Sequence, residues 1–129
     1  MEYKEYKEYK EEFKNDLFAI EFIGKKSILY LFLKGRSEDR NPALFMQPIF
    51  DRVLKEVTSK GYELIIDVQG LEFMVSSTVT PIIKLLERAN QNLLRVTVLY
   101  QNSVKWQKVN FSALRVFATK DERIKVKGI

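Results

Sequence analysis

The chain contains neither cysteine nor histidine among its 129 residues. Without cysteine there is no disulfide framework and no thiolate nucleophile, and the protein needs no oxidising compartment. Without histidine, the Ser/His and Cys/His pairs of many hydrolases are absent, and a metal site would have only carboxylates to work with. These absences disfavour most hydrolase and zinc-enzyme functions, so we expect a protein that is not an enzyme and that has no cofactor.

Long hydrophobic runs are also missing. The opening residues, MEYKEYKEYKEEF, hold no apolar signal-peptide core, and no later segment reaches the ~20 apolar residues that cross a bilayer. The hydrophobic content of 46% is nevertheless enough for one compact domain. We therefore expect a soluble, cytoplasmic protein with no membrane partner.

The net charge of +5 is unevenly distributed. Residues 1–14 hold four Lys and five Glu, whereas the chain from Gln101 onward holds seven Lys or Arg and two acidic residues. A basic surplus of this kind can meet an acidic partner, a phosphate or nucleic acid. The alternative is a solvated helix face and an edge strand kept soluble by lysines.

The N-terminus contains the one internal repeat, three copies of Glu-Tyr-Lys at residues 2–10, followed by Phe13. Tyrosines spaced by three form a loose aromatic stripe on a helix, which can dock on the domain or on a second copy in a homodimer. An unanchored polar arm is the alternative. We assign residues 1–14 to an N-terminal polar and aromatic extension and residues 15–129 to a single domain.

The domain alternates short apolar runs with amphipathic segments. Runs rich in aromatic and branched residues at 17–23 and 28–34, separated by GKKS, predict a hairpin. The later segments predict a helix at 48–60, a strand at 62–68, a helix carrying Ile82, Ile83, Leu85, Leu86 and Ala89, a strand at 93–100, a helix with Trp106, Val109, Ala113 and Phe117 on one face, and an edge strand at 123–127. The order ββαβαβαβ requires an α/β fold with a mixed sheet of about five strands and three or so helices.

The hydroxyl side chains of Ser76, Ser77 and Thr78 lie where the central strand gives way to the second helix. Thr80 followed by Pro81 would suffice to cap that helix, which begins at either Ser77 or Thr80. The other hydroxyls then lie in the loop that leaves a central strand, where open α/β sheets place ligand sites. A phosphate there would add about two negative charges at the positive end of a helix dipole. Ordinary capping and loop polarity are the alternative.

Two stretches resemble a known family. DVQGLEFMVSSTVTPIIKLLERA resembles the central strand and switch helix of STAS domains of the anti-sigma-factor-antagonist type, in which Leu-x-Phe-Met-Asp-Ser-Ser-Gly carries a serine phosphorylated by a partner kinase. GRSEDRNPALFMQPIFDRVL is similar to a pattern of SiaC-like regulatory phosphoproteins, a STAS-like group. Both matches place the phosphoacceptor at Ser76. Val75 stands where the families have Asp or Asn, and Thr78 stands where the first has glycine.

The resemblance implies a STAS-like fold and a non-enzymatic bacterial signalling protein that binds one partner when unmodified and releases or exchanges it when Ser76 is phosphorylated. The implied partners are a serine kinase of the anti-sigma-factor type, a phosphatase and a regulated effector. Ser77 and Thr78 are further candidate acceptors, and Arg36 or Arg40 is expected to pair with the phosphate. The residues expected to bind a partner are Gly35, Arg36, Ser37, Asp39, Arg40, Asn41, Val75, Ser76 and Thr80.

Three alternatives stay open. The first is a SiaC-like activator of a diguanylate cyclase. The second is a nucleic-acid-binding module that uses Trp106, Lys105 and Lys108 on the basic C-terminal helix, although Trp106 fits a buried stripe better than a stacking platform. The third is a metal held by Asp67 and Glu72, against which Asp67 is more simply explained as a residue that fixes the loop through backbone amides.

Overall fold

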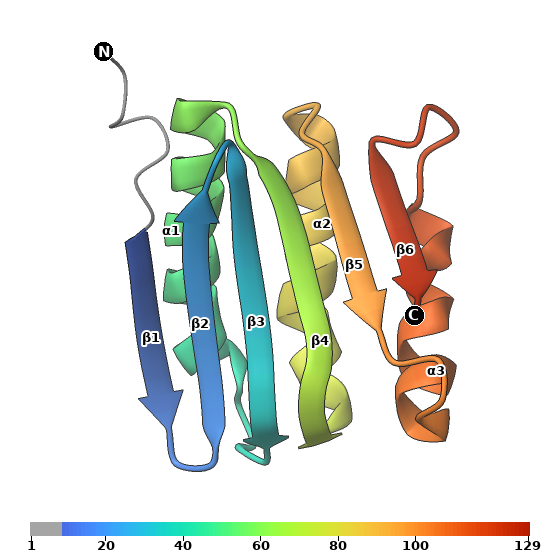
Figure 1. Ribbon diagram of the computed structural model, residues 1–129. Helices are drawn as coiled ribbons and strands as arrows, with labels where there is room; N and C mark the ends of the chain where they lie inside the picture. Colours follow the sequence, from blue (N-terminus) through green and yellow to red (C-terminus); the bar gives the residue numbers. More distant parts are fainter. Residues whose placement is uncertain (1–8) are drawn as a thin grey trace.

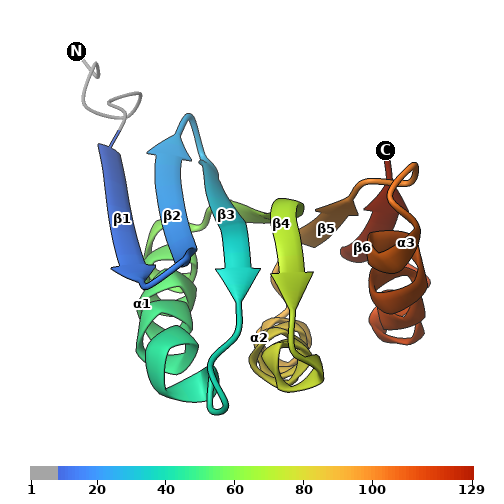
Figure 2. The ribbon, with the colours of Figure 1, turned by 90° about the horizontal axis from the view of Figure 1, so that it is seen from below.

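The computed structural model describes residues 9–129, which form one mixed sheet of six strands with three helices packed on one face (Figures 1 and 2). The strand order follows the chain, β1-β2-β3-β4-β5-β6. β2 pairs antiparallel with both β1 and β3, and the last three strands continue parallel to β3. The strands are β1 (Tyr9–Asn15), β2 (Phe18–Lys25), β3 (Ile28–Ser37), β4 (Glu63–Met74), β5 (Val96–Tyr100) and β6 (Ile124–Gly128), and the helices are α1 (Ala43–Lys60), α2 (Val79–Gln91) and α3 (Lys105–Ser112).

The expected α/β class, mixed sheet and hairpin are therefore confirmed, with one strand added. Residues 9–14, assigned from sequence to an extension, belong to the sheet as β1. Tyr9 and Phe13 pack against Phe22 of β2, so the strand uses a period of two where the repeat spacing of three suggested a helix. The rest of the repeat, including Tyr3 and Tyr6, lies outside the described residues.

The core lies between the sheet and the helices. Phe22, Leu31, Ile66, Val98 and Val126 form one cross-strand row, and all five are buried on the helix face. The helices share this face because consecutive right-handed crossovers that progress in one direction all pass over the same side of a sheet. The opposite face is covered by no helix of residues 9–129. That arrangement leaves both the open sheet face and the ends of the strands available to other molecules.

Helix α1 begins five residues before the predicted start at Pro48. Pro42 occupies the position just before the helix, with φ −63°, and its carbonyl accepts hydrogen bonds from Phe45 and Met46. Pro48 lies inside the helix, beyond its first turn, where it is exposed and cannot donate a hydrogen bond to the carbonyl of Leu44. The buried residues after Pro48 are Ile49, Phe50, Val53, Leu54 and Val57, and Gly61 ends the helix in the left-handed region. The earlier start shortens the loop after β3 to residues 38–42.

The third helical segment differs most from its prediction. Helix α3 ends at Ser112, and a 3-10 segment, η3 (Ala113–Phe117), follows it. The buried residues are Gln107, Phe111 and Leu114, whereas Val109, expected on the buried face, is 63% exposed. None of the helices formed by residues 9–129 has the length and apolar character needed to span a bilayer.

Candidate functional site

The candidate site is the rim where β3 and β4 end. These two strands are parallel neighbours, so their carboxyl ends reach the same edge of the sheet. From β3 the chain continues into the loop 38–42, and from β4 it continues into a 3-10 turn, η2 (Ser76–Thr78), that leads directly into α2. The structure therefore brings together the two sequence stretches that carry the family resemblance.

Two hydrogen bonds fasten the rim. The backbone amide of Val75 donates to the carbonyl of Ser37 at 2.9 Å. The hydroxyl oxygens of Ser37 and Thr78 lie 2.8 Å apart, and both side chains are fully buried. Burial makes this contact valuable, because either hydroxyl left alone in the interior would lack a partner. The turn at 76–78 and the end of β3 are thereby held as one unit.

The three hydroxyls of the run have different environments. Ser76 and Ser77 are exposed, whereas Thr78 is fully buried. The hydroxyl of Thr78, a candidate acceptor, is therefore inaccessible to a kinase in this structure. The side chain of Ser37, which was expected to contact a partner, is likewise inaccessible to that partner. Both side chains lie beneath the rim, and Ser76 and Ser77 are the candidate acceptors whose side chains are exposed.

The helix begins at neither of the two predicted positions. The 3-10 turn starts at Ser76 after Val75, and α2 starts at Val79 after Thr78; neither start has a side-chain cap. Thr80 is exposed within the first turn of α2 and is not the cap that its neighbour Pro81 suggested. Helix capping therefore does not account for the hydroxyls of Ser76 and Ser77.

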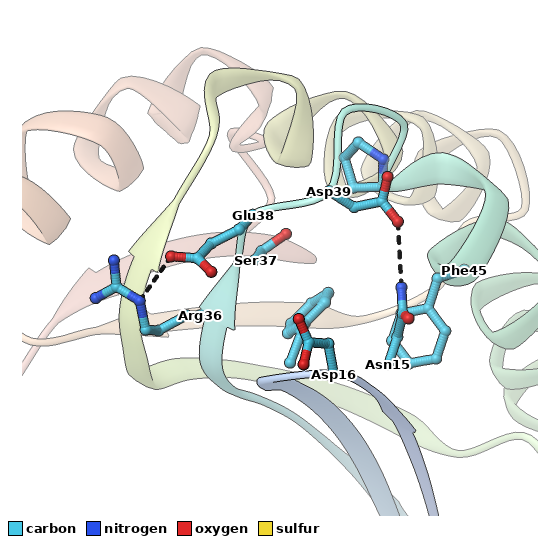
Figure 3. Close-up of a pocket in the computed structure, with 9 residues that line it drawn as sticks. Asn15, Asp16, Arg36, Ser37, Glu38, Asp39 and Phe45 are labelled. Atoms are coloured by element: carbon cyan, nitrogen blue, oxygen red, sulfur yellow. Dashed lines mark hydrogen bonds and ion pairs between the residues drawn. The ribbon is translucent and has the colours of Figure 1, made fainter.

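Beside this rim lies a depression of about 200 Å³, shown in Figure 3. The β1–β2 turn contributes Asn15 and Asp16, and Asn15 donates to Asp39 at 3.4 Å. Asp39 also accepts a hydrogen bond from the amide of Asn41 at 3.1 Å. The lining residues are Asn15, Asp16, Phe18, Arg36, Ser37, Glu38, Asp39, Pro42 and Phe45. Sequence reasoning missed the part played by Asn15 and Asp16, because it placed Asn15 at the boundary of an extension.

Arg36 is already engaged. Its Nε donates to Glu38 at 2.8 Å, and its guanidinium lies 4.8 Å from the ring centre of Phe73 on β4. In Figure 3 this ion pair lies at one side of the depression and the Asn15–Asp39 hydrogen bond at the other. The side chains of Arg36 and Glu38 are both about 40% exposed, at 41% and 43%, so the pair can open at little cost. Arg40 is exposed in the loop.

Gly35 shapes the rim through its backbone. Its φ is +84°, and a Cβ at this position would lie 2.1 Å from the carbonyl oxygen of Leu17. The same oxygen accepts the amide of Arg36 at 2.9 Å. The pairing of β3 with β4 also shifts register at Gly35 and Arg36. Gly35 is thus required by the close approach of the β1–β2 turn, and its expected contact with a partner stays a prediction.

Gln107 of α3 is a residue whose role sequence reasoning did not identify. It is 1% exposed, and its amide nitrogen lies 3.1, 3.1 and 2.9 Å from the carbonyl oxygens of Val68, Gln69 and Leu71. Its Oε1 accepts the amide of Gln101 at 2.8 Å. Gln107 therefore bridges β4 and the end of β5 where their direct pairing has stopped. The sequence signal that could have indicated this role is the position of Gln107, a polar residue directly after Trp106 of the expected apolar face.

The remaining candidates from the sequence are Asp67, as a metal ligand, and Trp106, as a nucleic-acid contact. Asp67 accepts hydrogen bonds from the backbone amide and the side chain of Gln69, at 2.9 and 3.2 Å, so it does fix local backbone. Among residues 9–129 no three His, Cys, Asp or Glu side chains come together as a metal site. Trp106 is half-buried and packs against Phe111, with ring centres 6.3 Å apart.

No protein-family model matches this chain, and a search among curated proteins finds no match either. The geometry of the rim is therefore the main guide to its role. It combines an exposed serine pair at the start of a helix, an exposed charged loop beside it and a buried contact that joins the two.

Proposed function

We propose that this chain is a non-enzymatic, partner-switching signalling domain of STAS-like type, controlled by phosphorylation of Ser76. In the unmodified state the rim formed by residues 38–41 and 75–80 binds a protein partner. Phosphorylation of Ser76 releases or exchanges that partner. The circuit implied by the resemblance, a serine kinase of the anti-sigma-factor type, a phosphatase and an effector, would operate in the cytoplasm.

The observation that carries this proposal is the contrast between Ser76 and Thr78. Two residues apart, one hydroxyl is exposed and uncommitted to a cap, while the other is buried against Ser37. The buried contact fixes the turn, and the turn presents Ser76 outward. A kinase requires such an exposed hydroxyl, and a partner-binding rim requires such a fixed turn.

The local electrostatics accommodate a phosphate. Ser76 opens a 3-10 turn that runs directly into the 13-residue helix α2, and the first turn of α2 contains no acidic residue. Backbone amides at the start of a helix carry a partial positive charge that stabilises an anion. A phosphoserine would bring about −1.5 to −2 charges to this edge of the sheet. The fold would tolerate the modification, and the surface that a partner meets would become more negative.

The neighbouring loop is the second half of the proposed interface. Glu38, Asp39, Arg40 and Asn41 are all exposed. Their mixed charges suit specific recognition of a protein surface, because unlike charges placed at fixed positions select one partner and register. The Arg36 guanidinium now pairs with the Glu38 carboxylate, and a phosphate on Ser76 would compete with that carboxylate for the guanidinium.

The proposal is tested by partner capture with variants of Ser76. We expect the wild-type protein and Ser76→Ala to retain the same protein from a lysate of the native organism, and Ser76→Asp to lose it. Ser59→Asp provides a matched control, because Ser59 is exposed near the end of α1 and outside the rim. Retention of the same partner by Ser76→Asp and by the enzymatically phosphorylated protein would contradict the switch. If the retained partner is a diguanylate cyclase, the domain acts as the SiaC-like activator.

A further inference from the structure

The outer edge of β1 is a second feature that the proposed function does not use. β1 is the first strand of the sheet, at the left in Figure 1, and no strand among residues 9–129 pairs with its outer side. A free strand edge presents backbone amides and carbonyls that can pair with another chain. Its sequence, YKEEFKN, alternates three charged residues on one face with two aromatic residues, a glutamate and an asparagine on the other.

The hairpin with β2 determines which backbone groups face outward. β1 and β2 are joined by the two-residue turn Asp16–Leu17, so Asn15 and Phe18 flank the turn as a pair. Flanking residues of such a turn exchange both backbone hydrogen bonds, and alternate residues back along the strand do the same. The backbone groups of Lys10, Glu12 and Lys14 therefore point to the outer edge. A new strand must pair with these three.

From this edge we infer that a second copy of the chain pairs with β1, antiparallel and about a two-fold axis at Glu11. In this register Lys10 of each copy, which also pairs with Glu21 of its own β2 at 2.9 Å, lies opposite Glu12 of the other, which gives two further unlike-charge pairs on the open sheet face. Cross-strand pairs of opposite charge stabilise a sheet and like charges destabilise it. The self-complementary charge pattern is what selects a second copy as the partner.

The other face of the strand is complementary in the same register. Tyr9 lies opposite Phe13 of the second copy, and the reverse pair forms on the other side of the axis. The two Glu11 residues meet at the axis, where each is already neutralised by an ion pair with Arg52 of its own α1. Aromatic cross-strand pairs are among the favourable ones in antiparallel sheets.

Neighbouring registers are less favourable. An axis at Glu12 would oppose Lys10 to Lys14 and Glu12 to its own copy, so both charged pairs would repel. An axis at Phe13 would join Glu12 to Lys14 but would place Tyr9 and Lys10 against the hairpin turn of the second copy. The axis at Glu11 keeps both the charge pairs and the aromatic pairs within the strands, and this specifies one arrangement.

An apolar groove continues from this edge. It is lined by Phe13, Leu44, Phe45, Pro48, Ile49 and Arg52, has a volume of about 390 Å³, and includes Leu44, which is 77% exposed. A two-fold axis perpendicular to the sheet places the α1 helices of both copies on the same side, flanking the joined strands. The second copy would therefore cover this groove as well as the strand edge. A lone protein would leave both exposed.

The test uses sedimentation velocity of the full chain over a range of concentrations. We expect a concentration-dependent dimer for the wild-type protein and its loss in Glu12→Lys, which opposes lysine to Lys10 of the second copy. Glu12 also lies across from Glu21 of β2, so the added lysine faces a carboxylate within its own sheet, and circular dichroism of the variant checks that the monomer is folded. Glu87→Lys is the matched control, because Glu87 is exposed on α2 and makes the same charge change away from the edge. The control is expected to dimerise as the wild type does.

A cysteine variant tests the register. The chain has no cysteine, so Glu11→Cys introduces a single thiol. Residues opposite each other in a non-hydrogen-bonded pair have Cα atoms about 4.5 Å apart, within the range that a disulfide spans. We expect Glu11→Cys to form a disulfide-linked dimer on mild oxidation, and Glu12→Cys to do so far more slowly. A wild-type protein that is monomeric at all concentrations, a dimer unaffected by Glu12→Lys, or faster cross-linking through Glu12→Cys would each overturn the inference. The result is independent of whether Ser76 is phosphorylated.

Discussion

The contact between Ser37 and Thr78 links the two halves of the candidate site at the level of single residues. Each hydroxyl is buried, and each supplies the other with a hydrogen-bond partner. Such contacts contribute a modest net free energy when formed, but a buried hydroxyl left unpaired is costly. The pair therefore favours the one arrangement of the 76–78 turn in which both partners are present, with Ser76 exposed.

This residue-scale account predicts non-additive effects. Thr78→Val and Ser37→Ala should each lower the free energy of unfolding by about 1–3 kcal/mol, because each strands one hydroxyl in the interior. The double variant should lose less than the sum of the two by roughly 1 kcal/mol. Urea unfolding of the four proteins gives the values, with Thr58→Val on the exposed face of α1 as the control. Strict additivity would show that the hydroxyls are not coupled.

Glu21 provides a second prediction at this scale. Its side chain is 6% exposed and lies between Lys34 and Lys10, at 2.8 and 2.9 Å. The hydrogen bonds from Lys34 and Lys10 lower the pKa of the Glu21 carboxyl below its ordinary value of 4.5. A carboxyl with a lowered pKa in the folded state stabilises the fold above its ordinary pKa, and this contribution is lost as pH falls through the lowered value.

We therefore expect Glu21→Gln to be less stable than the wild type at neutral pH by about 1 kcal/mol, since it loses a charge-assisted hydrogen bond. The difference should shrink as pH falls from 4.5, where the carboxyl of the unfolded chain takes up a proton, to the lowered pKa, where the carboxyl of the folded protein does so too. Thermal unfolding measured between neutral and acidic pH follows this trend directly. A difference that stays constant over the whole range would mean that the ion pairs do not act through the charge of Glu21.

Residue types predicted the location of the site better than the role of each residue. The resemblance and the hydroxyl run both led to Ser76, which is exposed as expected. They did not separate Ser76 from Thr78, because burial within a 3-10 turn depends on the strand packed beneath it. Ser37 and Gly35 were both expected to contact a partner. In the structure Ser37 contacts Thr78 and Gly35 approaches the Leu17 carbonyl, and a linear pattern does not reveal contacts with such distant segments.

At the scale of elements, α3 shows how one side chain joins a helix to two strands. On β4, only residues Leu64 to Asp67 pair with β5. Beyond that point, the side-chain amide of Gln107 donates hydrogen bonds to the backbone carbonyls of β4. A buried amide that satisfies several backbone groups fixes the position of its helix. The end of β5 and the start of α3 are held to the sheet by this bridge.

Gln107→Leu should accordingly lower the free energy of unfolding by about 2 kcal/mol or more, because buried carbonyls and the Gln101 amide lose their partner. It should also raise amide hydrogen exchange in β5 and α3 more than in the β2–β3 hairpin. Gln91→Leu at the exposed end of α2 is the control. Equal changes in exchange throughout the sheet would argue against a local bridge.

Elements were predictable wherever hydrophobic periodicity was strong. The stripe of α1, the apolar set of α2 and the β2–β3 hairpin all formed as expected. β1 was missed because its apolar residues are sparse and its charges resemble a solvated arm. The buried face of α3 was assigned wrongly because it contains Gln107 together with Phe111 and Leu114, and a polar glutamine was not counted among the buried positions.

For the whole molecule, the order of elements determined the topology and hence the place of the site. Parallel strands joined by helices put the ends of β3 and β4 at one edge, which is why two stretches some 40 residues apart meet there. The size and partner of that surface were not predictable, because they depend on tertiary contacts of the 38–42 loop. Among residues 9–129 the sheet leaves one face and the β1 edge open, so the proposed switch at the rim and the proposed dimer at the edge would use separate surfaces.

The measurement that tests the central claim most directly is phosphopeptide mapping of the protein recovered from its native organism under several growth conditions. The account predicts phosphate on Ser76, in a fraction of molecules that changes with conditions, and none on buried Thr78. Phosphate confined to Thr78, or a protein that is never modified between Ser76 and Thr80 under any condition, would contradict it.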